Sequence, residues 1–530
     1  MKINRMGSTA WAVATLTAMS ALAAAASCGS PEACDGVTFP TASGRVLRVS
    51  SQCGTANGTG SATVPFATIS AALAAAQTGD TVVVAAGTYT ESLDVKAGVN
   101  LVGAGATAVR VQPKTGAAIA IKGTGATKIS GIGVYNAVGF GIGISEGAEV
   151  VLQGVRVEKT VAAAQGTHLG YGVAATGAKS VSLQGCQLVG NSAVGLVSSG
   201  SGPISIIDPL FLKNPIASAR GAGTVGIIDP LFTPQSQITG NQGGGVAIID
   251  PLFAPTSDAS VAALTVSATD IAANGKYGIA LYGASATISR TAIRATKGNQ
   301  GDAADGLIVA PRQTALANAV ALAVNVDETS IITGNGRAGV LATGKCDVVV
   351  AAEVSLSGRG GVWAQGDTAK MRITKTAVLA QNAMVGVAVT AGATLELTGA
   401  RVVDTKVVAY VPPAGGTKVD LGDGIGVFGK ARGSVRDAVL KGNPRAGVIG
   451  HDCAANSSGL PDLQVENTSI TGSKYGVVIA GKYSQSNASA SAAPKDKGNS
   501  YADVANESAD EDLAVQESPC DGGKGCPAAP

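Results

Sequence analysis

The sequence predicts an all-β solenoid, a rod of short strands stacked in successive coils. Glycine is abundant, with 73 among 530 residues, and only 3% of residues are aromatic, which suits β-branched strands separated by tight turns. The hexapeptide Ile-Ile-Asp-Pro-Leu-Phe occurs at an even spacing, at 206–211, 227–232 and 248–253. A second pattern, Asn-x-x-x-Gly followed by an apolar residue, recurs along most of the chain. Such repeats are typical of units that bury their apolar faces only by stacking.

The N-terminus predicts an export signal. A basic start precedes an Ala-rich apolar run at 11–26, which is short for a membrane span. The run continues into Ala-Ala-Ser-Cys at 25–28, which resembles the lipobox of bacterial lipoproteins except that Ala25 replaces the preferred Leu. The resemblance implies removal of residues 1–27, lipid on Cys28 and an outer-membrane lipoprotein facing the periplasm or the cell surface. The alternative is an ordinary secretory signal cleaved nearby.

The stretch that begins at residue 64 predicts an end cap and the first coils. Residues 65–76 form a short amphipathic pattern with Ile69 and Leu73 on one face, and a Gly-Asp turn at 79–80 ends it. A β-branched strand and Gly-Thr-Tyr follow. This order resembles the N-terminal cap of right-handed parallel β-helix proteins, the pectin-lyase-like superfamily. The resemblance implies that fold, with the helix shielding the first open edge.

Four parts follow from these features: a lipoprotein signal peptide at 1–27, a linker at 28–63, the parallel β-helix domain at 64–483 and a disordered acidic tail at 484–530. The tail has eight acidic residues against three lysines and few large apolar residues, so it cannot bury enough surface to fold alone. The domain is expected to make about 14–16 coils. The net charge of +2 gives no field that favours nucleic acid.

Two residue types carry the structural expectations for the coils. Each asparagine of the Asn-x-x-x-Gly pattern is expected to mark a turn and to hydrogen-bond to its neighbours along the rod. Eight cysteines in an exported chain invite disulfides. Cys34 and Cys53 could clamp the N-terminal segment, and Cys520 and Cys526 could close a loop in the tail. The remaining three are expected to fill the interior as small apolar residues: Cys186, Cys346 and Cys453.

Three insertions fall at one phase of the repeat, just before a Gly-apolar strand, at 160–169, 297–304 and 406–422. Equal phase on a solenoid means an equal side of the rod, so these loops should project from one edge. Their polar residues are Gln165, His168, Asp302, Asp305, Lys406, Lys418, Asp420 and Asp423. The carboxylates suit Ca²⁺ binding or acid–base catalysis. The competing interpretation is that Asp-Gly pairs simply form turns, and the coils between the loops argue against one compact site.

The hexapeptide repeats predict a column of carboxylates, because Asp208, Asp229 and Asp250 share one phase. Ionised carboxylates about 5 Å apart repel each other, so such a column needs cations, hydrogen-bond donors or raised pKa values. The favoured interpretation is structural: Asp ends a strand, Pro fixes the corner, and Leu and Phe stack inside. Calcium bridging is the alternative.

The function that these features favour is a non-catalytic one. The chain lacks the Trp-Ile-Asp-His string of one lyase family in the superfamily, and its hexapeptide lacks both glycines of the pectin methylesterase motif. Few aromatic residues remain for sugar stacking, although several tyrosines are available. Basic residues before the turn glycines predict an edge that an anionic glycan could bind: Lys276, Arg337, Arg359, Arg445 and Lys474.

We therefore expect a cell-envelope lipoprotein with a surface or glycan-contacting role, partnered by an acidic polysaccharide and needing no cofactor other than, at most, Ca²⁺. One alternative is a polysaccharide lyase, hydrolase or pectinesterase-like enzyme that uses the acids of the loops. The other is a calcium-dependent adhesin that uses the aspartate column.

Overall fold

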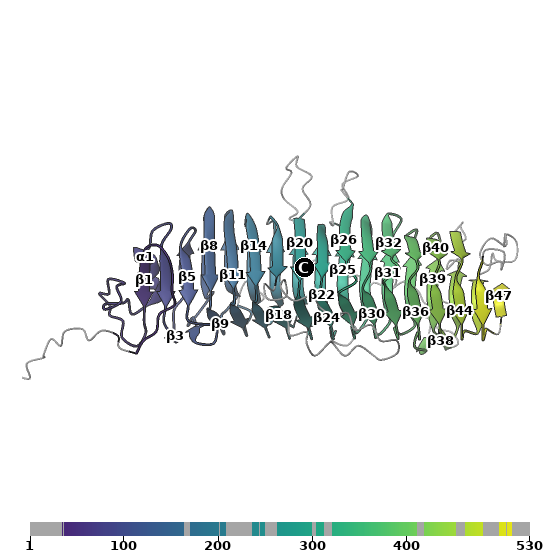
Figure 1. Ribbon diagram of the computed structural model, residues 1–530, viewed down its shortest axis with the longest axis horizontal. Coiled ribbons are helices and arrows are strands. Elements are labelled where there is room, and N and C mark those ends of the chain that lie inside the picture. Colours follow the sequence, from purple (N-terminus) through teal and green to yellow (C-terminus); the bar gives the residue numbers. More distant parts are fainter. Residues whose placement is uncertain are drawn as a thin grey trace, which may run out of the picture.

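The computed structural model shows a rod of stacked strands with a helix at one end (Figure 1). It describes residues 34, 36–163, 170–200, 202–207, 236–242, 244–249, 262–298, 304–311, 321–410, 418–451, 462–480, 498–504 and 506–510. Three sheets of 15 strands run along the rod, and every strand pair within them is parallel. The predicted right-handed parallel β-helix is thereby confirmed as the fold class, with the handedness that parallel crossovers adopt.

Sheet A contributes the first strand of each coil. Its strands are β1 (Val46–Val49), β2 (Thr81–Val84), β5 (Asn100–Gly103), β8 (Gly125–Ser130), β11 (Ala148–Gln153), β14 (Ser180–Gln184), β17 (Ile204–Ile207), β20 (Ala262–Ser267), β23 (Ala284–Ser289), β26 (Leu322–Val326), β29 (Cys346–Val350), β32 (Ala369–Ile373), β35 (Thr394–Thr398), β40 (Arg432–Arg436) and β43 (Asp462–Glu466).

Sheet B contributes the second, shortest strand of each coil. Its strands are β3 (Gly87–Tyr89), β6 (Val109–Val111), β9 (Gly133–Tyr135), β12 (Arg156–Glu158), β15 (Gln187–Val189), β18 (Ser236–Thr239), β21 (Thr269–Ala272), β24 (Ala292–Arg294), β27 (Ile331–Thr333), β30 (Glu353–Ser355), β33 (Val378–Ala380), β36 (Arg401–Val403), β41 (Val439–Lys441), β44 (Ser469–Thr471) and β46 (Ser500–Ala502).

Sheet C contributes the third strand of each coil. Its strands are β4 (Leu93–Lys96), β7 (Ile119–Lys122), β10 (Phe140–Ser145), β13 (Tyr171–Thr176), β16 (Val194–Ser199), β19 (Gly244–Ile249), β22 (Tyr277–Tyr282), β25 (Asp305–Ala310), β28 (Ala338–Thr343), β31 (Gly360–Gln365), β34 (Val385–Thr390), β39 (Asp423–Phe428), β42 (Ala446–His451), β45 (Tyr475–Ala480) and β47 (Asn506–Asp510).

The core runs along the axis of the rod and is filled by one side of every strand. In β29, Cys346, Val348 and Val350 are buried, whereas Asp347 and Val349 between them are only half-buried. This alternation is the period of two that a strand with one buried face requires. Successive coils repeat the pattern in register, so the inward side chains form one continuous apolar cluster from β1 to β45.

The spacing of the hexapeptides is not the length of a coil. The length of an uninterrupted coil varies around that spacing, as the register of sheet A shows: Thr81 pairs with Asn100, Ala262 with Ala284, and Cys346 with Ala369. An even spacing in the sequence therefore does not fix the register of a strand.

The prediction that the hexapeptides share one phase is accordingly wrong for the first and third copies. Ile206 and Ile207 end β17 in sheet A, while Ile248 and Ile249 end β19 in sheet C. Residues 208–235 separate β17 from β18, the next strand of the same coil. The residues predicted to form the column, Asp208, Asp229 and Asp250, lie outside the described residues.

The predicted asparagine ladder is present at the corner between sheets B and C. Asn191 Nδ2 donates to Asn241 Oδ1 at 3.0 Å, and Asn241 Nδ2 donates to Asn274 Oδ1 at 2.9 Å. Asparagine side chains here also donate to a carbonyl of the preceding coil, as Asn274 does to Ile238 O at 2.9 Å. The ladder asparagines are at most 1% exposed: Asn191, Asn241, Asn274, Asn335, Asn382 and Asn443. The ladder thus satisfies backbone groups that a tight buried corner leaves without partners.

Shorter hydroxyl side chains replace asparagine at this corner in other coils, where their backbone amides donate to the next asparagine. Thr296 N donates to Asn335 Oδ1 at 3.2 Å, and Ser357 N donates to Asn382 Oδ1 at 3.0 Å. Their own hydroxyls are buried and find no partner among the described residues. A hydroxyl is too short to reach the carbonyl that the amide of asparagine reaches.

The N-terminal end is closed by α1 (Ile69–Ala75), which packs on β1, β2 and β4. Thr68 caps the helix by accepting from Ala71 N at 3.2 Å, and the Glu91 carboxylate accepts from Ile69 N and Ser70 N at 2.8 Å. A carboxylate at a helix N-terminus satisfies amides that have no partner within the helix. The predicted capping helix is confirmed.

Both ends of the rod extend further than the sequence suggested. Strand β1 lies within the stretch assigned to a linker, 28–63, and pairs with β2; the structure corrects that assignment for this strand. A disulfide joins Cys34 to Cys53 in the same stretch, with 5.8 Å between their Cα atoms. At the other end, β46 and β47 continue sheets B and C into the predicted tail. The remainder of 484–530 lies almost entirely outside the described residues.

Candidate functional site

The outer side of sheet C differs from that of the other two sheets. In β28, Val340 and Ala342 point into the core, while Leu341 between them belongs to a separate apolar cluster on the opposite side of the strand. We call this cluster the sheet C outer face. Its members are Ala338, Leu341, Trp363, Val385, Ala388, Phe428, Ala446, Ile449, Tyr475 and Val478, each at most 5% exposed. A second apolar cluster continues it towards the N-terminus and includes Tyr277, Tyr282 and Ile308.

Aromatic rings lie flat on this face because glycines of sheet C leave room for them. A Cβ atom on Gly360 would lie 3.2 Å from Cε3 of Trp363, and one on Gly426 would overlap the ring of Phe428. A Cβ atom on Gly244 would likewise overlap the ring of Tyr277 from the neighbouring coil. A ring held flat against a sheet presents its other π-face outward. Faces of this kind are the surfaces on which sugar rings stack.

Two polar atoms on this side of sheet C have no hydrogen-bond partner. Trp363 Nε1 and Thr390 Oγ1 are buried and find none among the residues that the structure describes. An unsatisfied buried polar group costs about 1–3 kcal/mol. Such atoms are uncommon in folded proteins and indicate places where a ligand or another chain segment can supply the partner.

Two buried ion pairs lie at the edge where sheet C begins. Arg337 Nε donates to Asp305 Oδ1 at 2.8 Å, and the same oxygen accepts from Ala338 N at 3.0 Å. Further along the rod, Arg445 Nε donates to Asp423 Oδ1 at 2.7 Å. Both arginines also contact the second carboxylate oxygen, so each pair is bidentate.

These carboxylates are buried, which limits their chemistry. The side chain of Asp305 is 0% exposed and that of Asp423 is 4% exposed. Burial raises the pKa of Asp423, and the Arg445 guanidinium opposes that rise. The two aspartates lie four rungs apart on sheet C, about 19 Å, whereas paired carboxylates in glycoside hydrolysis lie roughly 5–10 Å apart. They are therefore not a catalytic pair.

The other acids of the predicted site are dispersed. Asp420 is exposed on the hairpin of β37 (Val408–Tyr410) and β38 (Val419–Leu421), flanked by exposed Lys406 and Lys418. Asp302 lies outside the described residues, as do Gln165 and His168. Within the described part of the chain, no three His, Cys, Asp or Glu side chains form a group that could hold a metal ion.

The insertions flank both long edges of sheet C. The three predicted from the sequence, 160–169, 297–304 and 406–422, all fall between a strand of sheet B and one of sheet C, so they share one side of the rod. The hairpin β37–β38 in the last of them packs on Ala383 and Met384, with Leu421 of β38 in the same apolar cluster. On the opposite edge, between sheets C and A, the connections at 250–261, 311–321 and 452–461 are also longer than a turn.

The predicted basic edge lies along the same face. All five residues immediately precede a strand of sheet C: Lys276, Arg337, Arg359, Arg445 and Lys474. Arg337 and Arg445 are buried in the ion pairs described above, while Lys276, Arg359 and Lys474 are exposed. The ammonium of Lys474 lies 4.6 Å from the centroid of the Tyr475 ring. Positive charge thus borders the aromatic surface.

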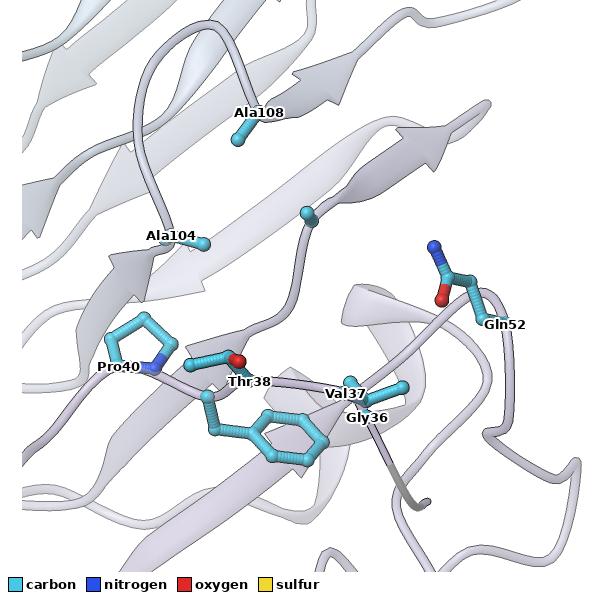
Figure 2. Close-up of a pocket in the computed structure, with 10 residues that line it drawn as sticks. Gly36, Val37, Thr38, Pro40, Gln52, Ala104 and Ala108 are labelled. Carbon is cyan, nitrogen blue, oxygen red and sulfur yellow. The ribbon is translucent and has the colours of Figure 1, made fainter.

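A cavity at the other end of the rod makes a poor site. It encloses about 490 Å³ near the N-terminal cap, between the segment 36–40 and the turn at 103–108. Figure 2 shows that its labelled walls are small or apolar side chains, with Thr38 and Gln52 as the polar ones. None of its lining residues is charged, so it offers little to orient a polar ligand.

The remaining predicted residues have structural surroundings or lie outside the described residues. Cys186 and Cys346 are free and buried in the core, and burial raises the pKa of the Cys186 thiol to about 11. Cys28, Cys453, Cys520 and Cys526 lie outside the described residues. No described helix is long and apolar enough to cross a membrane.

The sheet C outer face was not predicted from the sequence, in which its few aromatic residues are far apart. Their positions relative to the turn glycines, however, indicate the face. Tyr277 and Tyr475 directly precede the turn glycine, and Trp363 stands two residues after Gly361, which fixes the strand and the side of each ring. The number of residues between each aromatic residue and its turn glycine would therefore have predicted that these rings share one side of sheet C.

Comparisons with known proteins extend the description of the fold only. No family model and no curated protein matches the sequence. The pectate lyase Pel9A is 11% identical, with a TM-score of 0.36, over 68% of this chain and 78% of that one. A GH87 α-1,3-glucanase catalytic unit from Streptomyces thermodiastaticus strain HF3-3 is 13% identical, with a TM-score of 0.40, over 76% and 64%.

The A-module of the Azotobacter vinelandii mannuronan C-5 epimerase AlgE6 is 16% identical, with a TM-score of 0.30, over 83% of this chain and 94% of that one. At such low identities and scores these likenesses carry no argument about this chain. Its parallel β-helix fold rests on its own three parallel sheets.

Proposed function

We propose that this protein is an exported, lipid-anchored β-helix protein that binds an acidic polysaccharide on the sheet C outer face without cleaving it. The observation that carries the proposal is the row of aromatic rings held flat over glycines of sheet C, headed by Trp363. Sugar rings stack on aromatic faces through their apolar C–H sides. Because each residue of this face is at most 5% exposed, the proposal requires the face to become accessible when the ligand binds.

The charge at the border of this face favours an acidic ligand over a neutral one. Lys276, Arg359 and Lys474 are exposed along one edge, and cations there attract a polyuronate from solution. Trp363 Nε1 and Thr390 Oγ1, which have no partner among the described residues, are positioned to bond to sugar hydroxyls. The length of the row across successive coils suits a polymer, because the rungs repeat about every 4.8 Å.

A binding role without catalysis is supported by the surroundings of the acids. Asp305 and Asp423 are held in buried ion pairs about 19 Å apart, so neither is available as acid, base or nucleophile. The competing function is a polysaccharide lyase or hydrolase that uses the exposed Lys406, Lys418 and Asp420 near the β37–β38 hairpin. Those three side chains border sheet C and are accessible, which is the observation in its favour.

The test is a fluorescence titration of Trp363. In a Trp11→Phe background this residue is the only tryptophan, since the chain has two. We expect oligogalacturonate or oligoalginate to change its emission saturably, and a neutral α-glucan to change it little. Arg359→Ala should weaken binding about fivefold, roughly 1 kcal/mol, whereas Arg401→Ala, an exposed arginine of sheet B, should leave it unchanged.

Two results would count against the proposal. If no acidic or neutral oligosaccharide changes the emission of Trp363, the binding role fails. If new reducing ends or unsaturated uronates form, and Asp420→Asn or Lys418→Ala abolishes their formation, the enzymatic alternative holds instead.

The location is a second part of the proposal and rests on residues 1–28, which lie outside the described residues. We expect Cys28 to carry lipid, so the protein should remain with the membrane fraction and incorporate labelled palmitate. Cys28→Ser should release it into the soluble fraction without changing its fold. Incorporation of label that persists in the Cys28→Ser variant would contradict this assignment.

A further inference from the structure

Four buried hydroxyls at the corner between sheets B and C have no hydrogen-bond partner within the described part of the chain. They belong to Thr160, Thr296, Ser357 and Ser473, each at most 4% exposed. Each stands two residues after the end of a sheet B strand, which is the position of every ladder asparagine. A buried hydroxyl without a partner costs about 1–3 kcal/mol. The recurrence of that cost at one position of the repeat indicates a common missing partner.

From β21 onwards, asparagine and hydroxyl residues alternate along this ladder. The order along the rod is Asn274, Thr296, Asn335, Ser357, Asn382, Thr405, Asn443 and Ser473. Each hydroxyl residue therefore follows a coil that carries an asparagine. Towards the next coil its backbone amide is satisfied, as Thr296 N donates to Asn335 Oδ1 at 3.2 Å. Towards the preceding coil its hydroxyl bonds to nothing, so Thr296 Oγ1 accepts no hydrogen bond from Asn274.

Two consecutive asparagines show what the longer side chain provides at this position. Asn241 N and Asn241 Nδ2 both donate to Asn274 Oδ1, at 3.2 and 2.9 Å. Asn274 Nδ2 in turn donates to Ile238 O of the coil before, at 2.9 Å. One coil further, the amides of Asn274 meet Thr296, whose hydroxyl bonds to neither of them. By the register of sheet B, the carbonyl there that is equivalent to Ile238 O is Ile271 O.

The corner beside Thr296 also has more room than a corner that holds an asparagine. A Cβ atom on Gly306 would lie 2.7 Å from Asn335 Nδ2, so the carboxamide fills the space beside that glycine. Gly278 is the equivalent glycine before Thr296. The three atoms nearest to a Cβ atom on Gly278 would belong to Ile293 and Gly306, the farthest of them at 3.6 Å. No atom of Thr296 comes closer than that, so its side chain does not reach the place of the carboxamide.

We propose that one ordered water molecule is bound in the place of the carboxamide at each of three corners, those of Thr296, Ser357 and Ser473. At the first of them the water accepts from an amide of Asn274, shares a hydrogen bond with Thr296 Oγ1 and donates to Ile271 O. Three hydrogen bonds are typical of a buried water. The N–H donors disfavour a cation at this place, and the uncharged, buried surroundings disfavour an anion.

Two other corners of the ladder limit the proposal. Thr405 occupies the same position, but its hydroxyl donates to Asn443 Oδ1 at 2.7 Å, so it needs no water. Thr160 follows a coil in which Ala137 has this position. Alanine has no side-chain amide, so a water beside Thr160 would lack one of the partners named above, and the proposal does not extend to it. Thr405 is therefore a matched control within the same molecule.

A high-resolution crystal structure of the unaltered protein is the first test. We expect a density peak within about 3 Å of Thr296 Oγ1, Ser357 Oγ and Ser473 Oγ, and none beside Thr405 Oγ1. In the Thr296→Asn variant, the new Nδ2 should replace the first peak and leave the other two unchanged. Well-ordered corners without these peaks, with the hydroxyls turned onto protein carbonyls, would overturn the proposal. A peak about 2.3–2.6 Å from several oxygens would be a calcium ion and would also overturn it.

Magnetic relaxation dispersion of water oxygen tests the proposal in solution, because it counts long-lived internal waters. Thr296→Asn and Ser357→Asn should each lower the count by about one water, whereas Thr405→Asn should leave it unchanged. Circular dichroism and melting curves establish that each variant keeps its β-helix. An unchanged count in Thr296→Asn and Ser357→Asn would refute the proposal, as would an equal decrease in Thr405→Asn. Neither measurement depends on the polysaccharide binding proposed above, and the crystal structure of the unaltered protein remains decisive if a variant folds poorly.

Discussion

Sheets A and C share the same core and differ in what they present outside. In sheet A the outward positions include an accessible ion pair: Arg372 and Asp347 form a bidentate pair in which their side chains remain 46% and 33% exposed. In sheet C from β28 to β45 many outward positions are apolar or aromatic, and its buried pair, Arg337 with Asp305, is 7% and 0% exposed. The fold needs only the inward positions. The apolar outward residues of sheet C are therefore not required by the fold, and we interpret them as the functional face.

A lysine substitution should give the largest difference in stability between the outer sides of sheets C and A. Leu341→Lys places an ammonium in the closed face and removes packing, so we expect a loss of about 4–5 kcal/mol in the free energy of unfolding. Val349→Lys, on the adjacent strand of sheet A, should change it by less than about 0.5 kcal/mol. Urea unfolding followed by circular dichroism measures both. Equal losses would mean that the two sides do not differ.

The ion pairs should differ in the same direction. Arg337→Ala leaves the Asp305 carboxylate buried without its partner, and we expect a loss of about 3–5 kcal/mol. Arg372→Ala breaks an exposed pair of the same bidentate geometry and should cost about 0–1 kcal/mol. Chemical unfolding of the two variants side by side gives the difference. A cost for Arg337→Ala below that of Arg372→Ala would contradict the burial assigned to the first pair.

Asparagines at the edges of the two sheets provide a smaller contrast. Asn241 donates from Nδ2 to Leu188 O and Asn274 Oδ1, and its own Oδ1 accepts from Asn191. Asn241→Ala should therefore cost about 2–3 kcal/mol. On sheet A, the side chain of Asn100 accepts one hydrogen bond, from Lys128 N at 2.9 Å.

We expect Asn100→Ala to cost about 0.5–1 kcal/mol. Thr296→Asn should have the opposite sign, since an amide at that corner can donate to a carbonyl of the preceding coil, as Asn274 does to Ile238 O. Thermal melts rank the three variants. Destabilisation by Thr296→Asn would indicate that the corner has no room for the longer side chain.

Alkaline pH should lower the stability of the folded protein, because buried tyrosines on the outer side of sheet C lose their protons. Burial raises the pKa of Tyr282 to about 12, from an ordinary value of 10.0. In the unfolded chain the proton leaves first, so this contribution to stability is complete below pH 10 and is lost as the pH rises towards 12. Unfolding measured at successive pH values should show this decline, and Tyr282→Phe should reduce it. A tyrosine titration in the folded protein near pH 10 for this residue would contradict its burial.

The sequence predicted the repeating architecture well, because that architecture depends on local patterns. The turn asparagines, the capping helix around Ile69 and Leu73, and the alternation in strands such as β29 each follow from short-range rules. The phase of the hexapeptides did not. Their even spacing resembles a coil repeat, but Ile206 and Ile248 occupy different sheets, because a long connection separates β17 from β18.

The candidate site was harder to predict, since it depends on which side of a strand each residue occupies. Asp305 and Asp423 were correctly placed on one edge, but their burial against Arg337 and Arg445 requires knowledge of neighbouring coils 32 and 22 residues away. Trp363 is 1% exposed although it lies on the side of its strand opposite to the core, and no pattern in β31 predicts that burial. Burial on that side of a strand depends on how the coils assemble, which local sequence patterns do not describe.

The most direct test of the difference between the two outer sides is the rate at which a maleimide modifies a cysteine placed on each. Leu341→Cys and Val349→Cys lie on β28 of sheet C and β29 of sheet A, which follow each other in the chain. Peptide-level mass spectrometry distinguishes the new thiols from the native ones. The cysteine at 349 should react readily, while the one at 341 should react more slowly by a factor on the order of 100 or more, because Leu341 is 0% exposed and its modification requires local opening of the structure. Similar rates at the two positions would contradict it.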